Sequence, residues 1–170
     1  YIDFLLNICN KYSIKLIISL FDLELPILAQ HRVKFENKGI VLAISSFEAI
    51  EICNDKYKTL SFTKKFDIPC ISTYIDLEYV KRDLELGAIN FPLYVKPRWG
   101  MGSISTQIAN NLEELKILFS KVKEGIEKSY LKHYPGIILD KSIIVQEFAN
   151  GTEYGLDVIN DFNGNYITTF

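Results

Sequence analysis

The segment Phe91–Ser105 constrains the fold of this chain most strongly, because it joins two apolar runs through a loop that opens at a lysine. The first run ends at Lys96, and Gly100 and Gly102 lie in the loop that follows. Glycine adopts positive φ without strain and lets backbone amides approach an anion closely. The pattern indicates two strands, with one fixed cation beside a flexible loop that suits a triphosphate. An ordinary glycine-containing hairpin with a surface lysine would give the same pattern.

Composition excludes several other classes of protein. Of the 170 residues, 48% are hydrophobic and 24% are charged, which is the balance of a soluble globular chain. A formal net charge of −2 argues against a nucleic-acid surface, and no run reaches the ~18 apolar residues that would cross a membrane. Cys9, Cys53 and Cys70 lack zinc-site spacing and suit a reducing cytosol. We therefore expect a cytoplasmic protein with no nucleic-acid or membrane partner.

Residues 1 to about 50 alternate between helical and strand patterns. Apolar residues at helical spacing predict helices over Ile2–Tyr12 and Glu24–Asn37, and short apolar runs predict buried strands at Lys15–Phe21 and Ile40–Ile44. A further helix is expected from Ser46 onward. Strands that alternate with helices indicate a parallel sheet covered by helices. We expect this part to be the end of a doubly wound α/β domain.

The rest of the chain has a more mixed pattern. We expect helices over 55–66, 77–86 and 111–123, and strands over 142–148, 154–160 and 166–170. Residues 125–141 contain Pro135 and Gly136 and are predicted to mix helix and loop. The chain starts at Tyr1 rather than at a methionine and stops inside a predicted strand. We therefore expect it to be an excerpt from a longer protein.

Three separated segments carry residues that suit a nucleotide. Lys56 opens a predicted helix directly after Asp55, and Lys96 precedes the glycine loop. In the third segment, a predicted strand breaks after Phe148 and a new one starts near Glu153, which frees backbone groups that can pair with the edge of an adenine. Two lysines supply the positive charge that a triphosphate needs.

Taken together and in this order, the three segments resemble the ATP-grasp superfamily, and within it the carbamoyl-phosphate-synthase-like and carboxylate–amine ligase members. The resemblance implies an α/β fold in which the end of a doubly wound pre-ATP-grasp domain precedes an incomplete α+β ATP-grasp domain. Residues 1–50, which include Phe21-Asp22-Leu23-Glu24-Leu25, would form the former. Residues 51–148 would form the N-terminal lobe of the latter, and 149–170 the start of its truncated C-terminal lobe.

The resemblance also implies roles at the phosphate end of an ATP site. Lys56 and Lys96 would contact the α- and β-phosphates. The loop 98–105, with Gly100, Gly102 and Ser103, would fold over the phosphates as a lid. The family's magnesium ligands lie further along the second lobe, so Mg²⁺ is expected to be bound downstream of this chain. The resemblance names no metal ligand and no catalytic residue here.

At the adenine end, the resemblance assigns residues of the strand that joins the two lobes. Gln146 matches a position usually held by an acid that faces the adenine amino group, so the sequence departs from the family pattern there. The carbonyl of Glu147 and the amide of Ala149 would read the adenine edge, and Glu153 would hold the ribose.

Other nucleotide folds fit the sequence less well, and structural alternatives stay open. A P-loop and a protein kinase both place the lysine after the glycines, whereas Lys96 comes before them. A dinucleotide fingerprint would need a glycine where Ser105 stands. Lys56 could pair with Asp55 or Glu51 on a helix surface, and Glu153 could pair with a lysine across strands.

The resemblance implies an ATP-dependent ligase that activates a carboxylate as an acyl phosphate for attack by an amine or similar nucleophile. Its partners would be ATP and small carboxylate and amine substrates, and a homo-oligomer is compatible with it. The excerpt itself is expected to be inactive. Two alternatives remain open, a non-catalytic nucleotide-binding module for regulation or assembly, and a purely structural α/β fragment.

Overall fold

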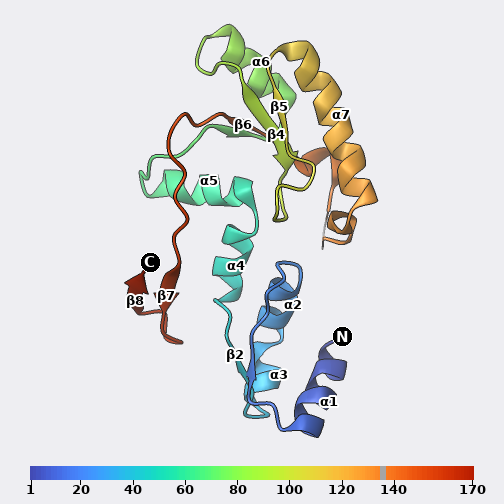
Figure 1. Cartoon of the computed structure of the whole chain (residues 1–170), viewed down its shortest axis with the longest axis vertical. Coiled ribbons are helices and arrows are strands. Elements are labelled where there is room, and N and C mark those ends of the chain that lie inside the picture. Colours follow the sequence, from blue (N-terminus) through green and yellow to red (C-terminus); the bar gives the residue numbers. More distant parts are fainter. Residues whose placement is uncertain (135–136) are drawn as a thin grey trace. The chain divides into compact units, whose positions relative to one another are not determined.

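The computed structural model describes residues 1–134 and 137–170, and within them the chain divides into two compact units. One unit comprises Tyr1–Ile50 together with Asn150–Phe170, and the other comprises Glu51–Ala149. Figure 1 shows the elements in chain order. The predicted assignment of Pro135 and Gly136 to mixed helix and loop lies outside the described residues.

The N-terminal part of the first unit has the predicted order of helices and strands. Its elements are α1 (Ile2–Tyr12), β1 (Leu16–Ile17), α2 (Glu24–Gln30), α3 (Arg32–Glu36), β2 (Val41–Leu42) and α4 (Phe47–Cys53), which extends into the second unit. Strands β1 and β2 pair in parallel, with Leu16 opposite Val41. The helix predicted as far as Asn37 breaks at His31, whose backbone leaves the helical region at φ −108° and ψ 13°. Both strands are shorter than predicted.

An apolar cluster holds these elements together. The side chains of Leu28 and Phe35, from α2 and α3, are fully buried in it beside Leu42 of β2. The remaining part of the unit is an antiparallel hairpin of β7 (Val158–Asn160) and β8 (Tyr166–Thr169). A turn in which the Gly164 amide donates to the Asp161 carbonyl joins the two strands, and β7 starts later than predicted.

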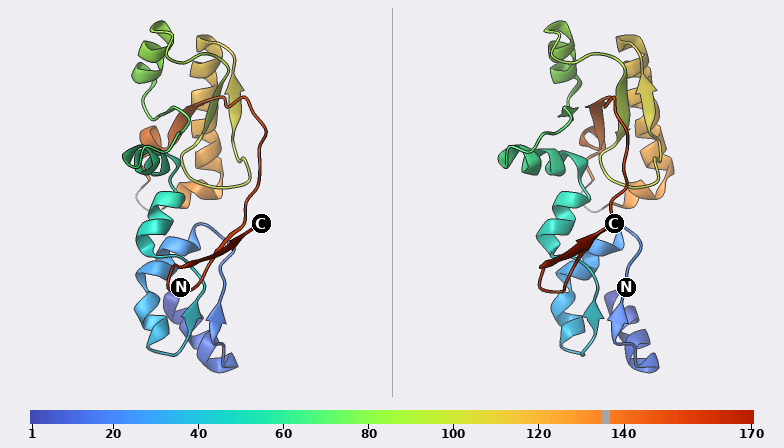
Figure 2. Two further views of the ribbon diagram at one scale, coloured as in Figure 1. Left: turned by 90° about the vertical axis from the view of Figure 1, so that its left-hand side faces the viewer. Right: turned by 60° about the vertical axis from the view of Figure 1, so that its left-hand side comes forward.

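The second unit is an antiparallel four-stranded sheet with helices packed against it. Its elements are α5 (Lys56–Lys65), β3 (Thr73–Tyr74), α6 (Leu77–Glu85), β4 (Leu93–Pro97), β5 (Gln107–Ala109), α7 (Leu112–Lys128), the 3₁₀ helices η1 (Tyr130–His133) and η2 (Leu139–Lys141), and β6 (Ile143–Glu147). The strands lie in the order β3–β6–β4–β5. Helix α7 packs against β4 and β5, as both views of Figure 2 show.

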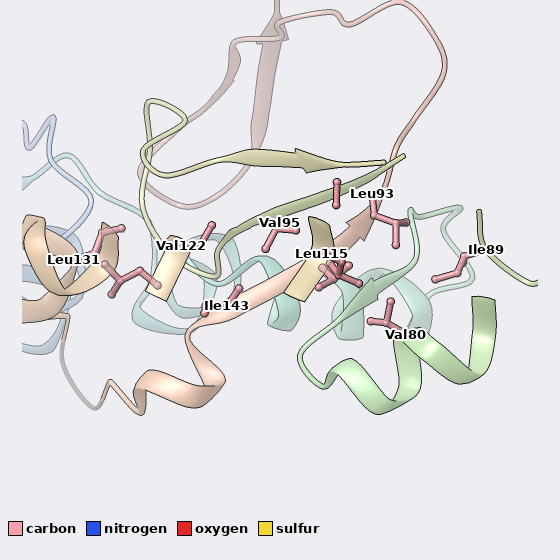
Figure 3. Packing of buried hydrophobic residues seen from close by; sticks show 11 residues of the cluster. Val80, Ile89, Leu93, Val95, Leu115, Val122, Leu131 and Ile143 are labelled. Carbon is pink, nitrogen blue, oxygen red and sulfur yellow. The ribbon is translucent and has the colours of Figure 1, made fainter. Parts of the chain in front are cut away.

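One face of this sheet is apolar, and the opposite face is mixed, with the buried Ile144 directly across from Lys96. Strand β4 alternates strictly, so that Leu93 and Val95 are fully buried while Tyr94 and Lys96 on the other face are half-buried. The buried side chains meet those of α6 and α7 in one cluster, shown in Figure 3. Burying each such aliphatic side chain stabilises the fold by about 1.5–3 kcal/mol. This packing leaves the alternate side chains of β4 and β6 on the opposite face.

Helix α7 extends one turn beyond the predicted end at Lys123. Its start is as predicted, because the side chain of Asn111 accepts a hydrogen bond from the Glu114 amide and so caps the helix. Val122 and Ile126 continue its apolar stripe into the core, and this tertiary packing carries the helix to Lys128.

Candidate functional site

The start of α5 is fixed by a buried carboxylate. Asp55 is 1% exposed, and its side chain accepts hydrogen bonds from the amides of Tyr57 and Lys58, which would otherwise lack partners at the helix terminus. The same carboxylate forms an ion pair with Arg98, at 2.7 Å from Oδ2 to Nη2 and 2.7 Å from Oδ1 to Nε. The first residue of α5 is thereby held against the end of β4.

Lys56 is that first helical residue, and it contacts the start of the glycine loop. Its Nζ donates to the carbonyl of Gly100 at 3.0 Å and to that of Arg98 at 3.4 Å. The two alternative partners considered for it are engaged elsewhere, since Asp55 pairs with Arg98 and Glu51 pairs with Lys58 at 2.7 Å. The structure therefore brings Lys56 to the loop that follows Lys96.

The glycine loop is anchored at both of its ends. At its start, the Trp99 ring stacks on the Tyr134 ring with their centroids 4.8 Å apart. Gly100 has φ +95°, and a Cβ added there would lie only 2.6 Å from the Leu131 side chain. At its end, Ser105 packs so closely on Gly125 of α7 that a Cβ there would lie 2.1 Å from its Oγ. Only Met101, Gly102 and Ser103 are exposed.

The loop also has the backbone conformation expected of it. Gly100 and Gly102 both have positive φ, as predicted, and so do Ser103 and Ser105. The role of the loop as a lid stays a prediction. Its anchored ends restrict the part that can close over a ligand to residues near 101–103.

Lys96 lies on the face of the sheet opposite the apolar cluster, beside an aromatic ring. Its Nζ lies 5.4 Å from the centre of the Tyr94 ring, and that ring stacks on Phe148 at 5.2 Å. Within the described residues, no carboxylate lies within ion-pair distance of Lys96. Burial lowers the pKa of Lys96, because desolvation disfavours its charged form. A polyphosphate bound there would restore the stability of the charged form.

Gln146 lies directly across the ladder from Tyr94, on the same face. Its Nε2 donates to the hydroxyl of Thr73 at 2.9 Å, and that hydroxyl donates to the Ile71 carbonyl at 3.0 Å. A hydroxyl has one proton, so Thr73 can only accept from Gln146, and the amide nitrogen of Gln146 must face it. The amide oxygen Oε1 therefore remains as an acceptor, the same polarity as the acid that the resemblance leads us to expect at this position.

The other residues predicted to contact the adenine edge and the ribose lie at and after the end of β6. Glu147 is the last residue of β6, and its amide donates to the carbonyl of Ser72 at 3.0 Å. Ala149 follows, exposed, at the end of the second unit. Glu153 belongs to the other unit and is also exposed, so its role stays a prediction.

Two residues with structural parts in this site were not singled out from the sequence. Arg98 was predicted only as part of the lid, whereas its side chain is buried against Asp55. Thr73 lies in a short apolar segment that follows Pro69, and it accepts a hydrogen bond from the amide of Gln146. The residues next to Asp55 and Arg98 in the sequence did not indicate that these two side chains, 43 positions apart, form an ion pair.

Comparison with known proteins places both parts of the chain. Residues 89–169 match the family model described as ATP-grasp domain, and residues 1–43 match that of the PylC-like N-terminal domain. The predicted resemblance to the ATP-grasp superfamily is thereby confirmed. The predicted fold class, an α/β segment before part of an ATP-grasp domain, is confirmed by these matches.

Curated relatives point to the carboxylate–amine ligase branch of the ATP-grasp superfamily. The carbamoyl phosphate synthase large chain of Thermoanaerobacter sp. strain X514 is 28% identical over 72% of this chain and 10% of its own length. The D-alanine–D-alanine ligase of Leptospira biflexa is 25% identical over 74% of this chain and 33% of its own length. The chain thus spans between a tenth and a third of these two relatives.

Solved structures show the same fold. The biotin carboxylase of Campylobacter jejuni aligns with a TM-score of 0.71 at 15% identity, over 96% of this chain and 35% of that one. The D-alanine–D-alanine ligase of Helicobacter pylori aligns with a TM-score of 0.63 at 22% identity, over 89% and 42%. Within residues 1–134 and 137–170, no helix of the chain is long and apolar enough to cross a membrane.

Proposed function

We propose that the protein is an ATP-dependent ligase that activates a carboxylate as an acyl phosphate for attack by an amine or similar nucleophile. The observation that carries the proposal is the arrangement around the glycine loop, where Lys56 contacts the loop carbonyls and Lys96 stands at the end of β4 just before it. Two lysines next to a loop with positive-φ residues suit a polyphosphate. The family membership and the named relatives support the same chemistry.

In the proposed reaction, the substrate carboxylate attacks the γ-phosphorus of ATP and ADP leaves. The amine then attacks the acyl carbon, and phosphate leaves with its bonding electrons. The protein's share is to position the reactants and to neutralise charge. Lys56 and Lys96 would bind the α- and β-phosphates, while Gly100, Gly102 and Ser103 would supply loop groups that exclude water.

At the base, Gln146 would accept a hydrogen bond from the adenine amino group through Oε1. The backbone of Glu147 and Ala149 would read the rest of the adenine edge, and Glu153 would hold the ribose. The orientation of the Gln146 amide supports this assignment, because Thr73 leaves an acceptor where the family has an acid.

Mg²⁺ would neutralise the phosphates when bound. In the described part of this chain, no three acidic, histidine or cysteine side chains cluster at metal-binding distance. The ligands of Mg²⁺ are proposed to lie downstream of this chain.

The test is nucleotide binding by the full-length protein after Lys96→Met, which keeps the aliphatic stem beside Tyr94 but removes the charge. We expect the Kd for ATP to rise about 10- to 100-fold, the loss of one charge-assisted contact. Lys116→Ala, on the exposed face of α7, is the matched control and should leave the Kd unchanged. Equal ATP affinity in the Lys96→Met variant and the unmodified protein would defeat the proposal.

Turnover separates the ligase from a module that only binds nucleotide. ADP release in the presence of Mg²⁺ and a panel of amino acids is expected of the ligase. Tight ATP binding without ADP release under these conditions would favour a regulatory or assembly role.

A further inference from the structure

The ion pair between Asp55 and Arg98 is the most buried one among the described residues. The side chains are 2% and 15% exposed, whereas each of the other ion pairs there has at least one partner that is 34% exposed or more. Its geometry is bidentate, with two parallel 2.7 Å contacts. This fork-to-carboxylate arrangement fixes orientation as well as distance.

Arg98 is held from several directions. Its guanidinium lies 5.4 Å from the Tyr57 ring and 5.0 Å from the Trp99 ring, and Nη1 donates to the Lys141 carbonyl at 3.4 Å. Its amide donates to the carbonyl of Ser142 at 2.8 Å. The residue thus joins the start of α5, the end of β4 and the segment before β6.

The same pair determines where the Lys56 ammonium lies. The carbonyl of Arg98 accepts hydrogen bonds from both the amide and the Nζ of Lys56, at 3.2 Å and 3.4 Å. The carbonyl of Gly100, two residues on, accepts from the same Nζ at 3.0 Å. The backbone that carries the Arg98 fork is therefore also the backbone that holds Lys56.

Stability alone is a weak reason for such a pair. Removing two charges from water costs about as much as their attraction returns, and apolar residues of similar volume often serve equally well. What a bidentate pair does supply is a fixed geometry between two segments. Here the segments are the one that bears Lys56 and the one that opens the glycine loop.

We propose that the Asp55–Arg98 ion pair is a positioning element that locks the Lys56 ammonium to the start of the glycine loop, so that lysine and loop meet a polyphosphate as one unit. The inference rests on the proposed ATP binding. In this proposal, Arg98 stays fixed at the base of the loop, and only residues near 101–103 move to close over the ligand.

The experiment separates positioning from stability by neutralising both partners in the full-length protein. Asp55→Asn keeps a side-chain acceptor for the helix cap, and Arg98→Met fills most of the volume of the arginine stem. In the Asp55→Asn/Arg98→Met double variant, we expect the Tm to lie close to that of the unmodified protein. The Kd for ATP should stay at least about tenfold weaker, because a misplaced binding group loses affinity without loss of fold.

A double-mutant cycle with Lys56 gives the decisive readout. In the unmodified background, Lys56→Met should weaken ATP binding, whereas in the neutral double variant it should add less than about twofold, because the ammonium is no longer held in place. Lys96→Met should cost the same factor in both backgrounds. Arg98→Lys, with Asp55 unchanged, should bind ATP more weakly than the unmodified protein, since an ammonium cannot form the bidentate contact.

The outcomes distinguish two failures. If the unmodified protein does not bind ATP, the proposed function is wrong and the inference falls with it. Suppose instead that the unmodified protein binds ATP, that the double variant has the same Kd and Tm, and that Lys56→Met raises the Kd by the same factor in both backgrounds. The pair is then only structural, and the inference alone is overturned.

Discussion

At the scale of single residues, the hydrogen bonds of Gln146 give its amide one orientation at a position where the resemblance leads us to expect an acid. An acid at this position can only accept, whereas an amide can present either end. Thr73 removes that freedom, because its single proton is donated to Ile71 and its oxygen must accept from Nε2. We therefore expect Gln146 to favour a base that has an amino group over one that has a carbonyl at the same position.

This expectation can be measured by comparing ATP with ITP, whose base carries a 6-oxo group. The full-length protein should bind ATP more tightly, because the 6-oxo group would face the acceptor Oε1. Thr73→Val keeps the shape of the side chain but frees the amide to rotate, so the ratio of the two affinities should fall about tenfold, the value of one hydrogen bond and its repulsive counterpart. Gln146→Glu is the control, and should preserve the preference for ATP. An unchanged ratio in Thr73→Val would show that Thr73 does not set the orientation.

At the scale of elements, the loop between β4 and β5 shows what the sequence could and could not predict. Two glycines after a strand-ending lysine predicted the loop, the positive φ of Gly100 and Gly102 and both flanking strands, but not the positive φ of Ser103 and Ser105. The anchors came from elsewhere, because Trp99 meets Tyr134, Gly100 meets Leu131, and Ser105 meets Gly125 only once α7 and η1 have packed. Periodicity within one segment carries no information about such contacts, so the predicted lid was longer than its exposed part.

The two glycines of this loop should respond differently to alanine. Gly102 is exposed at φ +66°, with no atom within 4 Å of an added Cβ, so Gly102→Ala should lower the free energy of unfolding by about 1 kcal/mol. Gly100 has φ +95°, and an added Cβ would lie 2.6 Å from Leu131, so Gly100→Ala should cost about 3 kcal/mol from strain and overpacking. Urea denaturation of both variants provides the comparison. Equal losses would mean that Gly100 is not held against η1.

At the scale of the whole molecule, the order of elements followed from the sequence more reliably than their lengths. Helices α1, α5 and α6 lie close to their predicted bounds, because capping residues and periodicity are local signals. The strands of the N-terminal part shrank to two residues each, since the apolar run at 15–21 pairs only through Leu16 and Ile17. Pairing depends on a neighbouring strand, which no local pattern contains.

The whole molecule also offers a test that separates nucleotide binding from a purely structural role. MgATP at 100 times its Kd should stabilise the folded state of the full-length protein by about 2.7 kcal/mol, because the ligand binds the folded state alone. Hydrogen exchange should show where that stabilisation acts. We expect slower exchange of amides near 55–58, 98–106 and 146–149, and little change over 1–43, the segment that matches the PylC-like domain. The Lys96→Met variant at the same nucleotide concentration is the control and should lose most of this protection. If MgATP left the exchange rates of these amides unchanged in the unmodified protein, the lysines and the glycine loop would not form a nucleotide site.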